Sequence, residues 1–117
     1  MRVLVCGGRE YSDFEQVDRI LDLLREVEPM EVLIQGGATG ADALAKAYAE
    51  CKGIPIITEE AEWHLHGKAA GPILNEAMIK KHKPTILIAF PGGKGTENMI
   101  RLARRYKIKV IEIQDNQ

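Results

Sequence analysis

The 117-residue sequence has almost no charge imbalance and few aromatic side chains. Its 16 basic and 17 acidic residues leave a net charge of −1, which argues against a general nucleic-acid binder, because such proteins usually carry a clear basic excess. Aromatic residues make up only 5% of the chain, so few bases of a single strand could stack on it. Binding to nucleic acid, including single-stranded DNA, is therefore disfavoured.

The sequence is also poor in cysteine and has no long apolar run. Cys6 and Cys51 lack the spacing of a paired motif, so we expect two buried thiols in a reducing compartment and no disulfide. The three histidines do not suggest a metal site, and we expect no bound metal or other cofactor. No segment reaches membrane-spanning length, and the chain enters a predicted strand at once, without a signal peptide. We therefore expect a cytoplasmic protein with no membrane partner.

What the sequence does contain is a regular alternation of apolar runs and helical patterns. Uninterrupted, β-branched runs predict five strands, at residues 2–6, 31–35, 54–58, 85–89 and 109–113. Apolar residues at helical spacing, together with proline and glycine boundaries, predict four helices, at residues 14–27, 41–52, 72–81 and 96–106. Within this scheme Gly53 caps the second helix and Pro72 is the first residue of the third.

Strands that are apolar at every position are typical of a parallel sheet covered by helices on both faces. A β-α repeat with right-handed crossovers predicts a single α/β, doubly wound, Rossmann-like domain over residues 1–117, with a five-stranded parallel sheet in the order 3-2-1-4-5. Residues 115–117 are expected to form a loose tail. Ligands of such sheets bind beyond the carboxyl ends of the strands where the order reverses, here between the first and fourth strands.

Three predicted strands end in glycine-rich turns at this edge. The turns are Gly7-Gly8-Arg9, Gly36-Gly37-Ala38-Thr39-Gly40 and Pro91-Gly92-Gly93-Lys94-Gly95-Thr96. A strand, a glycine turn and a helix together are typical of a phosphate site, because bare backbone N–H groups and the positive helix end face the anion. We expect the three turns to share one crevice in which unpaired amides face an anionic ligand. The alternative for the third turn is a tight connection capped by Thr96.

Two charged residues beside these turns are candidate ligand contacts. The planar guanidinium of Arg9 suits bidentate phosphate binding, or it would form a surface ion pair with Glu10 or Asp13. The carboxylate of Asp42 suits a ribose hydroxyl, or it would only stabilise the N-terminus of its own helix. The sequence leaves both pairs of alternatives open.

Residues 58–71 are long for a loop in a small domain, which is typical of a functional or mobile segment. They include the only tryptophan, Trp63, which would either stack on a nucleobase or anchor the loop. Asn75, in the first turn of the next helix, would bond the ligand or an adjacent backbone. Tyr11 would stack on a base or pack beneath its loop, and Met78 is expected in the core.

Several motifs occur along the chain in a fixed order: Gly7-Gly8-Arg9-Glu10-Tyr11, Gly36-Gly37-Ala38-Thr39-Gly40-Ala41-Asp42, Trp63, Gly67-Lys68-Ala69-Ala70-Gly71-Pro72, Asn75, Met78 and Phe90-Pro91-Gly92-Gly93-Lys94-Gly95-Thr96. Together they resemble the YspA-like branch of the SLOG superfamily, which also includes DNA-processing protein A and the LOG cytokinin-activating enzymes. The resemblance covers almost the whole chain and implies a Rossmann-like fold that binds a nucleotide or a nucleotide-derived ligand. Because the superfamily is often dimeric, we expect a homodimer. Leu74 departs from the pattern, since this branch usually has an arginine there.

The LOG enzymes cleave the N-glycosidic bond of nucleoside 5′-monophosphates and release the base and ribose 5-phosphate. Their Pro-Gly-Gly-x-Gly-Thr motif is followed by two further residues and then a catalytic glutamate; that position is Met99 here, and the nearest acid is Glu97. The sequence therefore suggests a nucleotide-binding module that senses or sequesters its ligand. The alternative is an N-glycoside hydrolase in which Glu97, Asp42 or Glu10 stabilises the oxocarbenium-like centre.

Overall fold

The computed structural model describes residues 1–114; residues 115–117, predicted to form a loose tail, lie outside the described part. One sheet contains β1 (Arg2–Cys6), β2 (Val32–Gln35), β3 (Ile56–Thr58), β4 (Ile86–Ala89) and β5 (Lys109–Glu112). All neighbouring strands pair in parallel in the order β3-β2-β1-β4-β5, which confirms the predicted fold class and strand order. The strands are slightly shorter than the apolar runs that predicted them, apart from β1.

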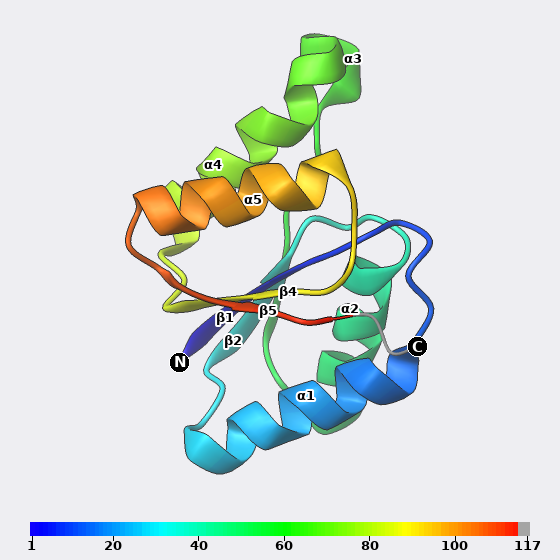
Figure 1. The fold of residues 1–117 in the computed structure, drawn as a ribbon, viewed down its shortest axis with the longest axis vertical. Coiled ribbons are helices and arrows are strands. Elements are labelled where there is room, and N and C mark those ends of the chain that lie inside the picture. The colour runs from blue at the N-terminus through cyan, green and yellow to red at the C-terminus, as the bar shows by residue number, and fades with distance from the viewer. Residues whose placement is uncertain (115–117) are drawn as a thin grey trace.

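The helices form one layer on each face of the sheet (Figure 1). One layer contains α1 (Phe14–Val27) and α2 (Ala41–Lys52), both with the predicted bounds, and the other contains α4 (Ala70–His82) and α5 (Lys94–Arg105). None of the helices within residues 1–114 is long and apolar enough to cross a membrane. The two layers and the parallel sheet make a Rossmann-like architecture.

The central strands are buried on both faces because alternate side chains point to opposite helix layers. In β1, Val5 packs in a cluster with Leu21 of α1 on one face. Leu4 packs on the other face in a cluster with Met78 of α4 and Met99 of α5. The burial of Met78 confirms the expectation that it belongs to the core.

The segment predicted as a long loop, residues 58–71, is partly helical. It contains the four-residue helix α3 (Trp63–His66) and a 3-10 turn (Gly67–Ala69), and Figure 1 shows α3 projecting beyond α4. Because the 3-10 turn leads directly into α4, that helix begins at Ala70, and Pro72 is its third residue instead of its first.

The last helix also begins earlier than predicted. The structure places its start at Lys94, with Gly93 as the N-cap, so Gly95 and Thr96 lie inside the first turn. Thr96 therefore does not cap the helix, and the alternative interpretation of this threonine is wrong. The shift brings the helix N-terminus closer to the end of β4.

The two cysteines differ in their surroundings. Cys6 is buried at the end of β1, as predicted, but Cys51 is exposed on α2, which corrects the expectation of two buried thiols. The buried face of α2 includes Tyr48 and Ala49. At 100° per residue, Cys51 lies about 120° around the helix from the centre of this buried face, and its side chain is exposed.

The loops at the carboxyl edge of the sheet are held together through the peptide groups of Gly8. Its N–H donates to the carbonyl of Pro91 (2.8 Å), and its carbonyl accepts from the amide of Ala41 (3.1 Å). Gly40 lies against this junction with a φ of +77°, and a Cβ placed there would be 2.1 Å from the Gly8 carbonyl oxygen. The β1–α1 loop thus contacts both neighbouring glycine turns through bare backbone.

Gly40→Ala should destabilise the protein far more than Gly53→Ala. Both glycines have a left-handed φ, +77° and +71°, but a Cβ on Gly53 meets nothing within 4 Å. The change at Gly53 should cost about 1–2 kcal/mol for the backbone conformation alone. The change at Gly40 should cost roughly 1–3 kcal/mol more, because the backbone junction must open. Urea denaturation measures both values, and equal losses would contradict the junction.

Candidate functional site

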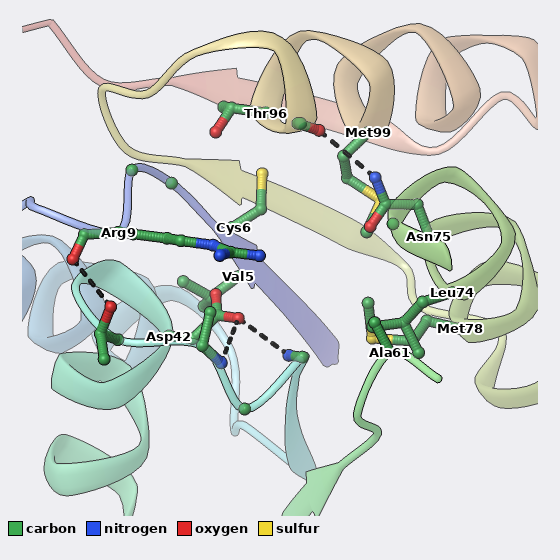
Figure 2. A pocket seen from close by; sticks show the side chains of 18 of the residues that line it. Val5, Cys6, Arg9, Asp42, Ala61, Leu74, Asn75, Met78, Thr96 and Met99 are labelled. Carbon is green, nitrogen blue, oxygen red and sulfur yellow. Dashed lines mark hydrogen bonds between the residues drawn. The ribbon is translucent and has the colours of Figure 1, made fainter. Parts of the chain in front are cut away.

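A cleft of about 620 Å³ lies at the carboxyl edge of the sheet, where the three glycine turns meet. This volume is within the range of about 300–1,000 Å³ typical of small-molecule sites. The structure brings most of the predicted site residues together in its wall: Gly7, Gly8, Arg9, Gly36, Gly37, Asp42, Trp63, Asn75, Gly93, Gly95 and Thr96. Figure 2 shows the side chains that face the cleft from both helix layers.

Three predicted site residues do not line this cleft. Gly40 instead allows the close backbone approach to Gly8. Pro91 and Gly92 instead line a neighbouring cavity on the other side of the β1–α1 loop. We call this cavity the second hollow. The predicted set therefore combines residues of the cleft with residues that support it or lie beside it.

Several backbone amides of the first two glycine turns are already hydrogen-bonded, contrary to the expectation that all three turns present free donors. Asp42 Oδ2 accepts from the amides of Gly36 (3.1 Å) and Ala38 (3.2 Å). The Gly8 amide donates to Pro91, as described above. The reason is general, because buried backbone amides are almost always satisfied within the protein.

Gln35 completes this second turn and was missed by the sequence analysis. It is fully buried at the end of β2, its Oε1 accepts from the Gly37 amide (2.6 Å), and its Nε2 donates to the hydroxyl of Thr58. Gln35 thereby joins the β2–α2 turn to β3. The signal that could have identified it is a polar side chain at the end of an otherwise apolar run.

The third turn keeps its amides free. Within residues 1–114, the N–H groups of Lys94, Gly95 and Thr96 have no hydrogen-bond acceptor, since intrahelical bonding starts with the Glu97 amide donating to the Gly93 carbonyl (3.0 Å). Gly93 and Gly95 line the cleft. The start of α5 therefore presents donors and the positive end of the helix dipole to the cleft.

Asp42 is the buried carboxylate of the cleft, with 8% of its surface exposed. Burial raises its pKa to about 6, although the amides of Ala38 and Gly36 and the charge of Arg9 act in the opposite direction. Its hydrogen bonds hold the β2–α2 turn, so its role differs from simple stabilisation of its own helix. Within the described chain its second oxygen, Oδ1, has no hydrogen-bond partner and remains a possible acceptor for a ligand.

The guanidinium of Arg9 extends across the cleft between Cys6 and Asp42 (Figure 2). Its Cζ lies 5.4 Å from the ring centroid of Trp63, within cation–π range. No carboxylate in residues 1–114 forms an ion pair with Arg9, so the surface-pair alternative is wrong. A cation is thus available inside the cleft.

Trp63 and Tyr11, the two aromatic candidates, are placed differently. Trp63 lies at the cleft, 48% exposed, with the edge of its ring near Gly71. Tyr11 is outside the cleft: its ring is 5.4 Å from that of Phe90, and its hydroxyl donates to Gln16. Tyr11 therefore packs beneath its loop, which is the second of the two predicted roles.

Asn75 connects the two helices of one layer. Its Nδ2 donates to Asn98 Oδ1 (2.9 Å) and to the carbonyl of Gly95 (3.3 Å). The contact with Gly95 fixes the first turn of α5, where the free amides lie. Asn98 was missed by the sequence analysis, because nothing in its local pattern distinguishes it from a surface residue.

Apolar side chains line much of the cleft: Val5, Cys6, Ala61, Leu74, Met78 and Met99. Met99 lies where the LOG enzymes have their glutamate, and Leu74 lies where the branch usually has an arginine. Glu97 does not line the cleft, because it precedes Met99 by two residues and points to another side of α5. Of the three predicted catalytic acids only Asp42 is in the cleft, since Glu10 lines the second hollow.

The fold and this cleft define a Rossmann-like α/β protein with a candidate ligand site at the carboxyl edge of a parallel sheet. The model of the YspA, cpYpsA-related SLOG family matches residues 1–66. The chain is also 34% identical over 122 residues to the Gene 61 protein of Mycobacterium phage D29, with 97% of each chain covered. The chain belongs to the YspA, cpYpsA-related SLOG family, which confirms the resemblance drawn from the glycine motifs.

The raised pKa of Asp42 predicts a specific dependence of stability on pH. Its pKa is about 6 in the folded state against 3.8 for a free side chain, so the folded state binds more protons between these values. The contribution of Asp42 to the free energy of unfolding should therefore fall as pH rises from about 4 to about 6, by at most about 3 kcal/mol.

Asp42→Asn should remove this dependence, because the amide oxygen can still accept from the β2–α2 turn but does not ionise. Urea denaturation at pH 4, 5, 6 and 7 gives the difference in unfolding free energy between the variant and the wild type. The difference should shift in favour of the variant as pH rises. A constant difference would show that burial does not raise the pKa of Asp42.

Proposed function

We propose that this protein binds a nucleotide or a nucleotide-derived small ligand in the cleft. A phosphate lies at the N-terminus of α5, the ribose lies near Asp42, and the base packs on the apolar wall near Trp63. Membership of the SLOG family supports a nucleotide-related ligand. The free amides of α5 and the unpaired guanidinium of Arg9 supply the donors and positive charge that a phosphate requires.

The observation that carries this proposal is the presence of glycine at 95, two residues after the glycine N-cap at 93. Neither residue has a positive φ, and a Cβ on either would meet nothing within 4 Å. A glycine inside a helix costs about 0.5–1 kcal/mol relative to alanine. Glycine at 93 also suits the backbone of a helix N-cap, but the protein's own packing gives no reason for glycine at 95, inside the first turn of α5. A phosphate bound to the amides supplies that reason, because it needs this surface free of side chains.

Charge within the cleft favours this orientation of the ligand. Asp42 repels a phosphate when ionised, so the phosphate is more stable on the α5 side than on the β2–α2 side. A ribose hydroxyl, in contrast, can donate to the unpartnered Oδ1 of Asp42. Sugar and phosphate are therefore directed to opposite walls.

The second candidate function is LOG-like N-glycoside hydrolysis, favoured by one observation. Asp42 is a buried carboxylate in the cleft with a pKa raised to about 6, which is typical of functional carboxylates. Chromatography of nucleoside monophosphates incubated with the protein separates the candidates. Release of free base that is lost in Asp42→Asn would support hydrolysis, whereas binding without release would support a sensing or sequestering module.

Gly95→Ala should stabilise the fold while weakening ligand binding. The methyl group improves helix propensity by up to about 1 kcal/mol and meets no neighbour, so the urea midpoint should rise. It also covers part of the amide surface, and loss of one charge-assisted contact should weaken binding about tenfold or more. Titration calorimetry with nucleoside monophosphates, NAD and ADP-ribose measures the affinity.

Lys80→Ala, on the exposed end of α4 and away from the cleft, is the control and should leave affinity unchanged. Equal affinity of Gly95→Ala and the wild type would place the phosphate elsewhere. Absence of binding to every ligand of this panel at millimolar concentration would overturn the proposed function itself.

A further inference from the structure

The second hollow adjoins the cleft and has a volume of about 700 Å³. It lies between the β1–α1 loop, residues 8–13, and the β4–α5 turn, residues 91–93. Gly8, Arg9 and Gly93 line both the cleft and the second hollow. The two spaces therefore meet along a ridge formed by these three residues.

Beneath this ridge, Gly92 packs closely against the backbone of Gly8 and the side chain of Thr96. A Cβ on Gly92 would lie 2.2 Å from Thr96 Oγ1 and 2.7 Å from the Gly8 nitrogen. A Cβ on Gly8 would lie 3.0 Å from the Pro91 carbonyl oxygen, whereas one on Gly93 would meet nothing. The ridge is thus closely packed underneath and open above Gly93. A ligand can lie across it at Gly93 without displacing a side chain.

The chemistry of the second hollow differs from that of the cleft. Glu10 and Ser12 are exposed side chains in its wall with no hydrogen-bond or ion-pair partner in residues 1–114. Asp13 also lines it, with Oδ1 accepting from the Gln16 amide. Carboxylates repel phosphate but accept hydrogen bonds from hydroxyl groups. This wall therefore suits a neutral, hydroxyl-rich group.

We propose that the second hollow binds the distal sugar of a nucleoside diphosphate sugar or dinucleotide whose diphosphate crosses the ridge at Gly93. This inference rests on the proposed function, which places a phosphate at the start of α5. The first nucleoside occupies the cleft, the diphosphate lies near the free amides, and the second sugar donates hydroxyl hydrogen bonds to Glu10 and Ser12. The ligand class is thus defined by two organic halves joined through phosphate.

Titration calorimetry with three ligand series tests this: AMP, ADP and ADP-ribose; UMP, UDP and UDP-glucose; GMP, GDP and GDP-mannose. In the series whose base is accepted, the sugar-bearing ligand should bind about tenfold or more tightly than the diphosphate, as expected for one or two added hydrogen bonds. The diphosphate controls for the second phosphate alone. Equal affinity of these two ligands would overturn the proposal.

The double variant Glu10→Gln, Ser12→Ala should lose most of the added affinity for the sugar-bearing ligand and keep the affinity for the monophosphate. Glu15→Gln, an exposed carboxylate of α1 outside the second hollow, is the matched control. Unchanged affinity of the double variant for the sugar-bearing ligand would also overturn the proposal. If monophosphates bind but longer ligands gain nothing, this inference fails alone; if nothing binds, the proposed function fails with it.

Discussion

The peptide groups of Gly8 are the constraint on which the carboxyl edge of this protein depends. Through one donor and one acceptor they join the β1–α1 loop to the β4–α5 turn and to the start of α2. Such contacts require backbones to approach without side chains between them. This explains Gly7, whose Cβ would lie 2.5 Å from that of Ala41, as well as Gly40 and Gly92. Much of the glycine content therefore serves packing between loops.

Gly93 and Gly95 differ from this group because nothing in the protein occupies the space above them. A glycine-rich turn in a sequence can thus have two physical origins that look alike before the structure is known. One is contact between neighbouring loops, and the other is an open surface of amides. Among the three glycine turns, all within residues 1–114, the turn that begins α5 is the one with three consecutive free amides beside glycines that have open space above them.

The architecture could be predicted from the sequence because it follows from regular patterns. Uninterrupted apolar runs such as Leu87 to Ala89 indicated buried parallel strands, and the connection rules then gave the strand order. The meeting of the three glycine turns followed from that order. The start of α5 was misjudged because glycine at 93 and 95 usually marks a loop, although here the first turn of the helix includes Gly95.

The hydrogen-bond acceptors of the backbone amides in the glycine turns could not be predicted. The side chains of Asp42 and Gln35 accept hydrogen bonds from the amides of the β2–α2 turn. These hydrogen bonds depend on the exact conformation of the turn, and no spacing rule in the sequence identifies them. As a result, the cleft has two unlike walls. The β2–α2 wall presents a carboxylate with a raised pKa, and the α5 wall presents N–H groups. A ligand bound as proposed would be oriented more strongly by this asymmetry than by three equivalent amide surfaces.

The position of Trp63 has an optical consequence. It is the single indole of the chain, it lies at the rim of the cleft, and the Arg9 guanidinium stands over its ring. Fluorescence excited at the red edge of the protein's near-ultraviolet absorption band therefore comes from Trp63 alone. Any molecule that moves the guanidinium away or stacks on the indole changes the emission directly, so the natural chain carries its own reporter of occupancy without an attached dye.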